Sequence, residues 1–98
     1  MATYVMLGKY SIDAVGEISA ERTKKADAAL RDIGGELKDV YFLLGATDLL
    51  LVVELPGTEA AMKASAALSK LLGISFTTSP AVSGKVFDRI MAEAQDRG

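Results

Sequence analysis

The centre of the chain reads Leu44-Gly45-Ala46-Thr47-Asp48, followed at once by Leu49-Leu50-Leu51-Val52-Val53-Glu54-Leu55-Pro56. A short turn with an acidic residue at its exit therefore runs into the most apolar segment of the protein. Because a strand that is apolar on both faces lies in the middle of a sheet, the segment predicts a central strand over Leu49 to Leu55. Gly45 to Asp48 is the expected hairpin turn, and Pro56-Gly57 ends the strand.

Before this turn, the pattern predicts two strands and one helix. The expected ranges are Thr3 to Tyr10 for the first strand, Ser11 to Gly16 for a connection, Ile18 to Ile33 for the helix and Glu36 to Leu44 for the second strand. The first strand is apolar on both faces and is expected in the middle of the sheet. Ser19 is the expected N-cap of the helix, and Gly34-Gly35 ends it. The apolar stripe of the helix consists of Ala26, Ala29, Leu30 and Ile33.

The second strand carries charge at its start, which favours the edge of a sheet. Strict alternation predicts that the side chains of this strand form two sets, which lie on opposite faces of the sheet. One set is Leu37, Asp39, Tyr41 and Leu43, and the other is Lys38, Val40, Phe42 and Leu44.

After the central strand, the pattern predicts a helix, a strand and a last helix. Thr58 is the expected cap of a helix over Glu59 to Leu72, which Gly73 ends. The buried stripe of that helix is expected to be Ala60, Ala64, Ala67, Leu68 and Leu71. A strand over Ile74 to Pro80 has one polar face, made by Ser75, Thr77 and Ser79. The last helix covers Lys85 to Gln95, starts at Ser83 or Gly84, and has an apolar stripe of Val86, Phe87, Ile90, Met91 and Ala94. Met6, Met62 and Met91 are interpreted as core residues.

This order of elements predicts an α+β fold, a ferredoxin-like βαββαβ sandwich in a single domain over residues 1–98. It has an antiparallel four-stranded sheet, two helices on one face and an extra C-terminal helix. The first and third strands are apolar on both sides, so the open face of the sheet also needs a cover. A ligand, the last helix or another chain could supply it, and a homodimer or larger assembly is the economical solution.

Composition excludes several classes of function. The 98 residues include no cysteine and no histidine, which removes thiolate and imidazole catalysis and the commonest metal and haem ligands. No suitably spaced acidic cluster is present, and we therefore predict no metal and no cofactor. The net charge of −2, without basic clusters, argues against nucleic acid and membrane surfaces as partners. With no signal peptide pattern and no long apolar run, we expect a soluble, cytoplasmic protein.

A set of spaced residues over nearly the whole core carries a family resemblance. The set is Tyr4-Val5, Tyr10-Ser11, Gly16, Arg22, Gly34-Gly35, Tyr41, Gly45, Asp48, Glu54, Pro56, Thr77 and Ser79. In this pattern the chain resembles the GYD domain family. Thr47 stands where that family has the tyrosine of its name, so no aromatic role is carried over to the turn. The resemblance implies a small, soluble, ferredoxin-like protein with no assigned reaction.

Six side chains are candidates for chemistry. Asp48 and Glu54 are candidate catalytic bases. The structural alternatives are a turn aspartate that bonds nearby amides, and a solvated strand-end glutamate or a partner for Arg22 or Lys9. The candidates for ligand binding are Tyr4, Tyr10, Arg22 and Tyr41. The structural alternative for the tyrosines is a core or interface position with the hydroxyl in contact with water. The structural alternative for Arg22 is an ordinary surface position.

The pattern favours a homo-oligomeric module that binds a small molecule or a partner without catalytic activity. Its expected partner is a second copy on the open sheet face, and its expected pocket, at a subunit boundary, involves Tyr4, Tyr10, Asp48 and Glu54. The alternative is a small cofactor-independent enzyme of the dimeric α+β-barrel type, with a carboxylate base and a tyrosine donor. The lack of histidine counts against the enzyme. Single-stranded RNA binding is disfavoured by the acidic charge and by the lack of stacking aromatics.

Overall fold

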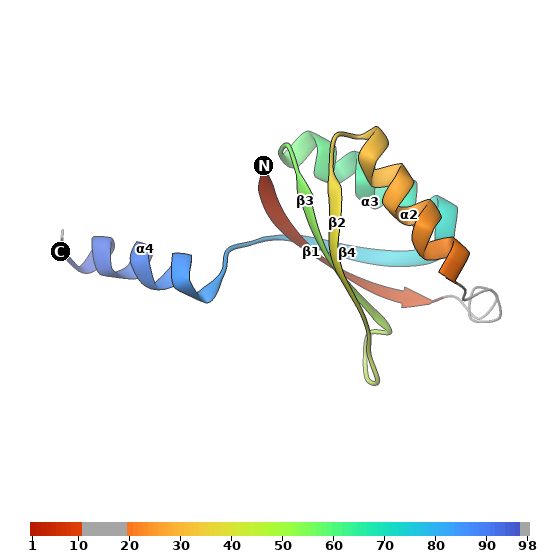
Figure 1. Ribbon diagram of the computed structural model, residues 1–98. Helices are drawn as coiled ribbons and strands as arrows, with labels where there is room; N and C mark the ends of the chain where they lie inside the picture. The colour runs from red at the N-terminus through yellow and green to blue at the C-terminus, as the bar shows by residue number, and fades with distance from the viewer. Residues whose placement is uncertain (11–19, 97–98) are drawn as a thin grey trace.

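The fold is a four-stranded antiparallel sheet with two helices on one face (Figure 1). The computed structural model describes residues 1–10 and 20–96. Its elements are β1 (Ala2–Tyr10), α2 (Ala20–Asp32), β2 (Glu36–Phe42), β3 (Leu49–Leu55), α3 (Thr58–Leu72), β4 (Ile74–Ala81) and α4 (Gly84–Asp96). The strand order β2-β3-β1-β4 places β1 and β3 in the centre, as their two apolar faces predict. The ferredoxin-like α+β prediction is confirmed. The expected connection over Ser11 to Gly16 and the Ser19 cap lie outside the described residues.

The core lies between the sheet and the helices α2 and α3. Alternate residues of β3 are buried, whereas Leu50, Val52 and Glu54 remain partly exposed on the opposite face. The largest fully buried side chains are Met6, Leu30, Val53, Leu55 and Leu68. They come from two strands and two helices, so the core joins every layer of the sandwich.

Two glycines end helices at the sites where the sequence predicts helix ends. Gly34 has a φ of 86° and Gly73 a φ of 65°, which is the left-handed conformation that glycine adopts without a steric cost. Gly35 is required for a different reason. A Cβ there would lie 2.7 Å from the backbone oxygen of Glu54 and would collide with Leu55. The turn from α2 to β2 therefore packs directly against β3.

The strict alternation predicted for β2 is wrong, because the strand contains a bulge. Leu37 pairs with Val53 and Asp39 pairs with Val52, so one extra residue lies between them on β2. Leu37 consequently shares the helix-covered face with Val40, and Asp39 lies on the open face with Tyr41. β2 also ends at Phe42 and not at Leu44, since residues 43–48 form the hairpin connection.

Three details of the predicted helices also need correction. Thr58 is the first residue of α3 and not its cap, because the N-cap is Gly57 and no side chain caps this end. Leu72 is buried in place of Leu71, and Ala61 joins the stripe. Met62 is 71% exposed, so it is not a core residue, and Met91 is exposed as well. Met6 is fully buried as predicted.

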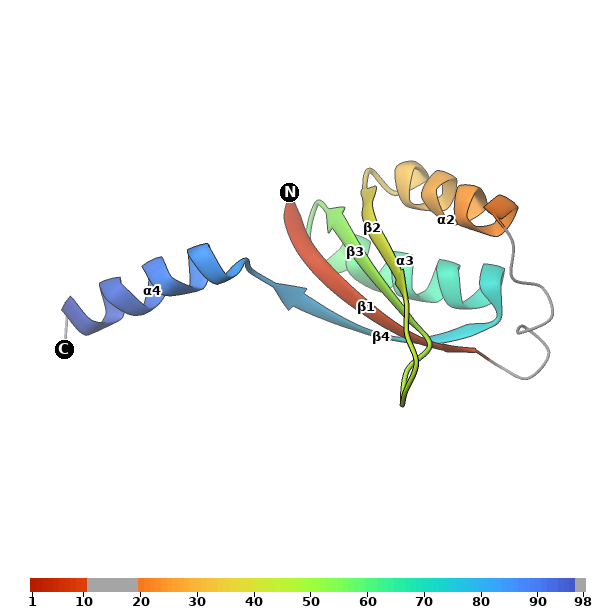
Figure 2. The same cartoon turned by 60° about the horizontal axis from the view of Figure 1, so that its bottom comes forward.

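The last helix, α4, projects away from the sheet in both views (Figures 1 and 2). Of the two starts that the sequence left open, Gly84 is the first helical residue, and Ser83 caps the helix because its Oγ accepts the Val86 N–H at 3.1 Å. The projection contributes to a longest dimension of 52 Å. It leaves Phe87, Ile90 and Met91 exposed. Consequently α4 does not cover the open face of its own sheet.

Candidate functional site

Asp48 forms hydrogen bonds that connect the end of β1 to the start of β3. Its Oδ2 accepts the N–H of Tyr10 at 2.9 Å. Its own N–H donates to the carbonyl of Gly8 at 2.8 Å, and its carbonyl accepts the N–H of Leu43 at 2.9 Å. These bonds engage both the backbone and the side chain, so Asp48 fixes where the Tyr10 ring leaves the sheet.

Arg22 joins the first turn of α2 to the last residue of α3. A guanidinium N–H of Arg22 donates to the carbonyl oxygen of Leu72. The final carbonyls of a helix have no partner within the helix and carry partial negative charge, so a cation there is favourable. The contact holds Arg22 beside Tyr10, at the same end of the sheet.

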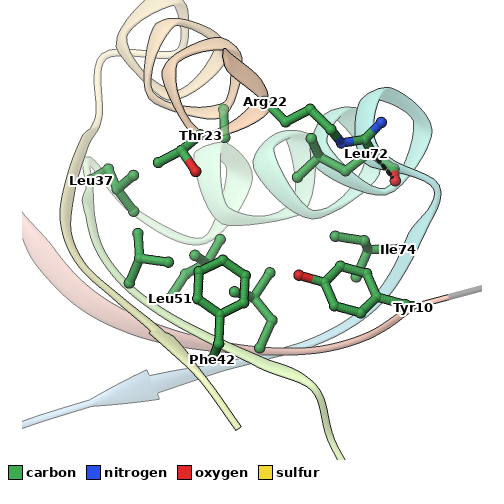
Figure 3. Close-up of a pocket in the computed structure, with 11 residues that line it drawn as sticks. Tyr10, Arg22, Thr23, Leu37, Phe42, Leu51, Leu72 and Ile74 are labelled. Carbon is green, nitrogen blue, oxygen red and sulfur yellow. Dashed lines mark hydrogen bonds between the residues drawn. The ribbon is translucent and has the colours of Figure 1, made fainter. Parts of the chain in front are cut away.

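A small pocket lies between α2 and this end of the sheet (Figure 3). The lining residues are Tyr10, Arg22, Thr23, Ala26, Leu37, Val40, Phe42, Leu49, Leu51, Leu72 and Ile74. Figure 3 shows the Tyr10 hydroxyl pointing toward the middle of the pocket, with the Phe42 ring across from it. The cavity volume is about 40 Å³, enough for about three water molecules. The walls are mostly apolar, and their polar groups are the hydroxyls of Tyr10 and Thr23 and the guanidinium of Arg22.

The electrostatic setting keeps the Tyr10 phenol protonated. Burial raises the pKa of Tyr10 above its ordinary value of 10.0, and the nearby Asp48 carboxylate raises this pKa further. The positive charge of Arg22 lowers the same pKa and so opposes part of the shift. Below pH 10 the hydroxyl is therefore available as a hydrogen-bond donor to a bound molecule.

The structure brings together three of the six candidate residues and separates the others. Tyr10, Arg22 and Asp48 gather at one end of the sheet. Tyr4 is buried in the core beneath the helices. Tyr41, which is 57% exposed, and Glu54 lie on the open face. Because Glu54 pairs with Thr3 and Asp48 bonds to Gly8 and Tyr10, the two carboxylates occupy opposite ends of β1.

Among the lining residues that the sequence did not predict as site residues, Thr23 lies on α2 and Phe42 lies at the end of β2. Thr23 precedes Ala26 by three positions, so helical spacing places it on the apolar stripe of α2, and this signal was available. Phe42 turns toward the helices at the exit of an edge strand. Alternation places Phe42 on the same face as Val40, but its proximity to α2 depends on how the strand packs.

Within residues 1–10 and 20–96, no group of three or more acidic side chains is arranged to hold a metal ion. None of the helices in that part of the chain has the length and apolar character needed to cross a bilayer.

Comparison with known proteins identifies a family and several similar solved structures. A family model described as "GYD domain" matches residues 4–91. The leucine response regulatory protein (LrpA) of Mycobacterium tuberculosis has a similar structure, with 11% identity, a TM-score of 0.56, and coverage of 84% of this chain and 51% of that one. A structure of a glutamate-to-alanine mutant is similar at 12% identity and a TM-score of 0.56, with coverage of 84% and 50%. The chain thus spans about half the length of either structure. No curated protein matches the sequence.

Proposed function

The chain belongs to the GYD domain family, and we propose that it acts as a homo-oligomeric module that binds a small molecule without transforming it. One observation carries the proposal. An apolar pocket between α2 and the sheet has Tyr10, Thr23 and Arg22 among its lining residues, which supply two hydroxyls and one positive charge. Ligand sites typically combine apolar walls with a few converging polar groups in this way.

The pocket chemistry suits a compact apolar molecule that carries one hydrogen-bond acceptor. Leu51, Leu72 and Ile74 supply apolar wall, and the protonated Tyr10 hydroxyl supplies a donor. The positive charge of Arg22 favours an acceptor with negative charge, such as the carboxylate of a short aliphatic or aromatic acid. The small volume limits such a molecule to a few heavy atoms unless the exposed Phe42 ring moves aside.

The oligomeric part of the proposal concerns the open sheet face. Its central residues form an apolar area, the open-face strip, which consists of Val5, Leu7, Tyr41, Leu50 and Val52. The register aligns them in two rows across β1, β3 and β2. A contiguous apolar patch on a sheet marks an interaction surface, and a second copy of the chain is the partner we propose.

The proposal contains no catalytic step. No carboxylate is present among the residues that line the pocket in the described part of the chain. Asp48 accepts the amide of Tyr10 next to the pocket, and Glu54 lies at the far end of the sheet. No observation favours the alternative of a carboxylate-dependent enzyme.

Nuclear magnetic resonance titration with a panel of short carboxylic acids tests the binding function. The expected result is a shift of amide signals at Tyr10, Thr23 and Phe42, with signals of the open-face strip unchanged. Tyr10→Phe removes one donor and is expected to weaken binding about 5- to 10-fold, since one hydrogen bond contributes about 1 kcal/mol. Tyr41→Phe removes the same group from the open face and is the matched control. Equal affinities of the two variants, or shifts confined to the open face, would contradict the assignment.

A further inference from the structure

The helix α4 presents an apolar stripe that remains largely exposed in the part of the chain that the structure describes. This α4 stripe consists of Val86, Phe87, Ile90, Met91 and Ala94, at helical spacing along one side. Phe87 is 51% exposed, and Ile90 and Met91 are exposed as well. Since such a stripe is unfavourable in water, α4 is built for contact with an apolar partner surface.

We propose that α4 is an exchanged arm, which lies across the open-face strip of a second copy while that copy returns its own arm. This inference rests on the oligomeric part of the proposed function and specifies the element that covers the sheet. Both views place α4 beyond the edge of its own sheet, pointing away (Figures 1 and 2). Among the described residues, one chain thus carries two apolar surfaces, the α4 stripe and the open-face strip, that do not meet each other.

The two surfaces agree in length. α4 has 13 residues, which corresponds to about 20 Å at the rise of an α-helix. β3, the central strand of the open face, has seven residues and extends about 23 Å. A single helix therefore covers the open-face strip from one end to the other.

The charges also agree, in one orientation of the helix. The open face has Glu36 and Glu54 side by side at one end and Lys9 toward the other. In the sequence of α4, the first half carries Lys85, Asp88 and Arg89 and is net positive, whereas the second half carries Glu93 and Asp96 and is net negative. These positions lie on the polar side of α4, so they act through the net charge of each half. With the first half of the arm over the Glu54 end, the net positive half lies near Glu36 and Glu54 and the net negative half near Lys9, whereas the reverse direction brings like net charges together.

The polar side of α4 favours a protein partner over a membrane. Lys85, Asp88, Arg89 and Glu93 balance one another in charge. Helices that lie on anionic membranes carry an excess of lysine and arginine on that side. The arm has no such excess, so a second copy of the chain is the occupant that we assign.

Single-cysteine variants test the exchange directly, because the natural chain contains no cysteine. Val52→Cys marks the middle of β3 and Ile90→Cys marks the middle of α4. The two full-length variants are oxidised separately, and also together after joint refolding that allows subunits to mix. A covalent dimer that forms in the mixture, and in neither variant oxidised separately, supports the exchanged arm. As a matched control, Ala92→Cys places the thiol on the opposite side of α4 and is expected to give no covalent dimer with Val52→Cys.

The other outcomes each overturn the inference and are distinguishable. A covalent dimer of Val52→Cys alone means that the sheets pack face to face, which leaves the proposed oligomer intact but not the arm. A covalent dimer of Ile90→Cys alone means that α4 pairs with α4. Light scattering of the natural chain that gives a monomer mass removes both the arm and the oligomer. Ligand binding in the α2 pocket is measured independently of all three.

Discussion

Asp48→Ala is predicted to destabilise the fold by removing the acceptor that holds the end of β1. In the natural chain, Oδ2 of Asp48 accepts the Tyr10 N–H at 2.9 Å. Hydrogen bonds to charged groups contribute about 1.5–3 kcal/mol, and the partial burial of this pair places it at the lower end. The expected loss is about 1.5 kcal/mol in the free energy of unfolding, or about 7 °C in Tm for a chain of this size.

Asp48→Asn separates the hydrogen bond from the charge. The amide oxygen of asparagine can still accept the Tyr10 N–H, so the loss is expected to be about half of that in Asp48→Ala. Both substitutions remove the negative charge that raises the pKa of Tyr10, so Tyr10 should titrate at lower pH in both. Thr47→Ala, one residue earlier in the same turn, is the control and should change stability by less than about 0.5 kcal/mol.

Urea unfolding followed by circular dichroism measures these free energies, and ultraviolet absorbance between pH 9 and pH 12 follows the tyrosines. Equal losses in Asp48→Ala and Asp48→Asn would refute the hydrogen-bond reasoning, because only one of them removes the acceptor. An unchanged tyrosine titration in both variants would refute the electrostatic coupling between Asp48 and Tyr10.

Two further predictions concern the α2–β2 turn and the phenol. Gly35→Ala is expected to cost about 2–3 kcal/mol because its Cβ would lie 2.7 Å from a backbone oxygen of β3. Gly84→Ala is the control, because nothing lies within 4 Å of a Cβ at that position. Its free energy of unfolding in urea should stay within about 0.5 kcal/mol of that of the natural chain. Similar losses in both variants would contradict the packing argument. Since the folded pKa of Tyr10 is raised, its stabilising contribution is complete below pH 10 and is lost as the pH rises through the folded pKa. Tm measured between pH 9 and pH 12 should therefore fall more steeply for the natural chain than for Tyr10→Phe, and parallel curves would rule this out.

Periodicity was sufficient to predict the layers of the fold. The segment Leu49 to Leu55 is apolar at every position but one, and only the middle of a sheet accommodates that pattern. Gly34 and Gly73 mark helix ends because the left-handed conformation has a distinct residue preference. These signals are local, so one chain is enough to interpret them.

Features that depend on contacts between elements were not predictable in the same way. The bulge in β2 depends on pairing with β3, and alternation alone grouped Leu37 with Asp39 and Tyr41, which lie on the other face of the sheet. Thr58 matches the composition of a cap, but the backbone places Gly57 at that position. The gathering of Tyr10, Arg22 and Asp48 joins three elements that are distant in sequence, and periodicity carries no information on such a meeting.

The sheet order has a consequence for how the chain folds. β1 is synthesised before both of its partner strands, since Val5 pairs with Val52 on one side and with Ser79 on the other. Both edges of β1 therefore stay unpaired until the chain has been synthesised up to Leu55, and one edge stays unpaired until it has been synthesised up to Ala81. Long loops must close before those pairings form, and this slows folding. Until then, the partly folded chain exposes unpaired strand edges and is prone to aggregation. The hairpin of β2 and β3, which pairs across a short connection, can form early and provide the edge on which β1 later docks.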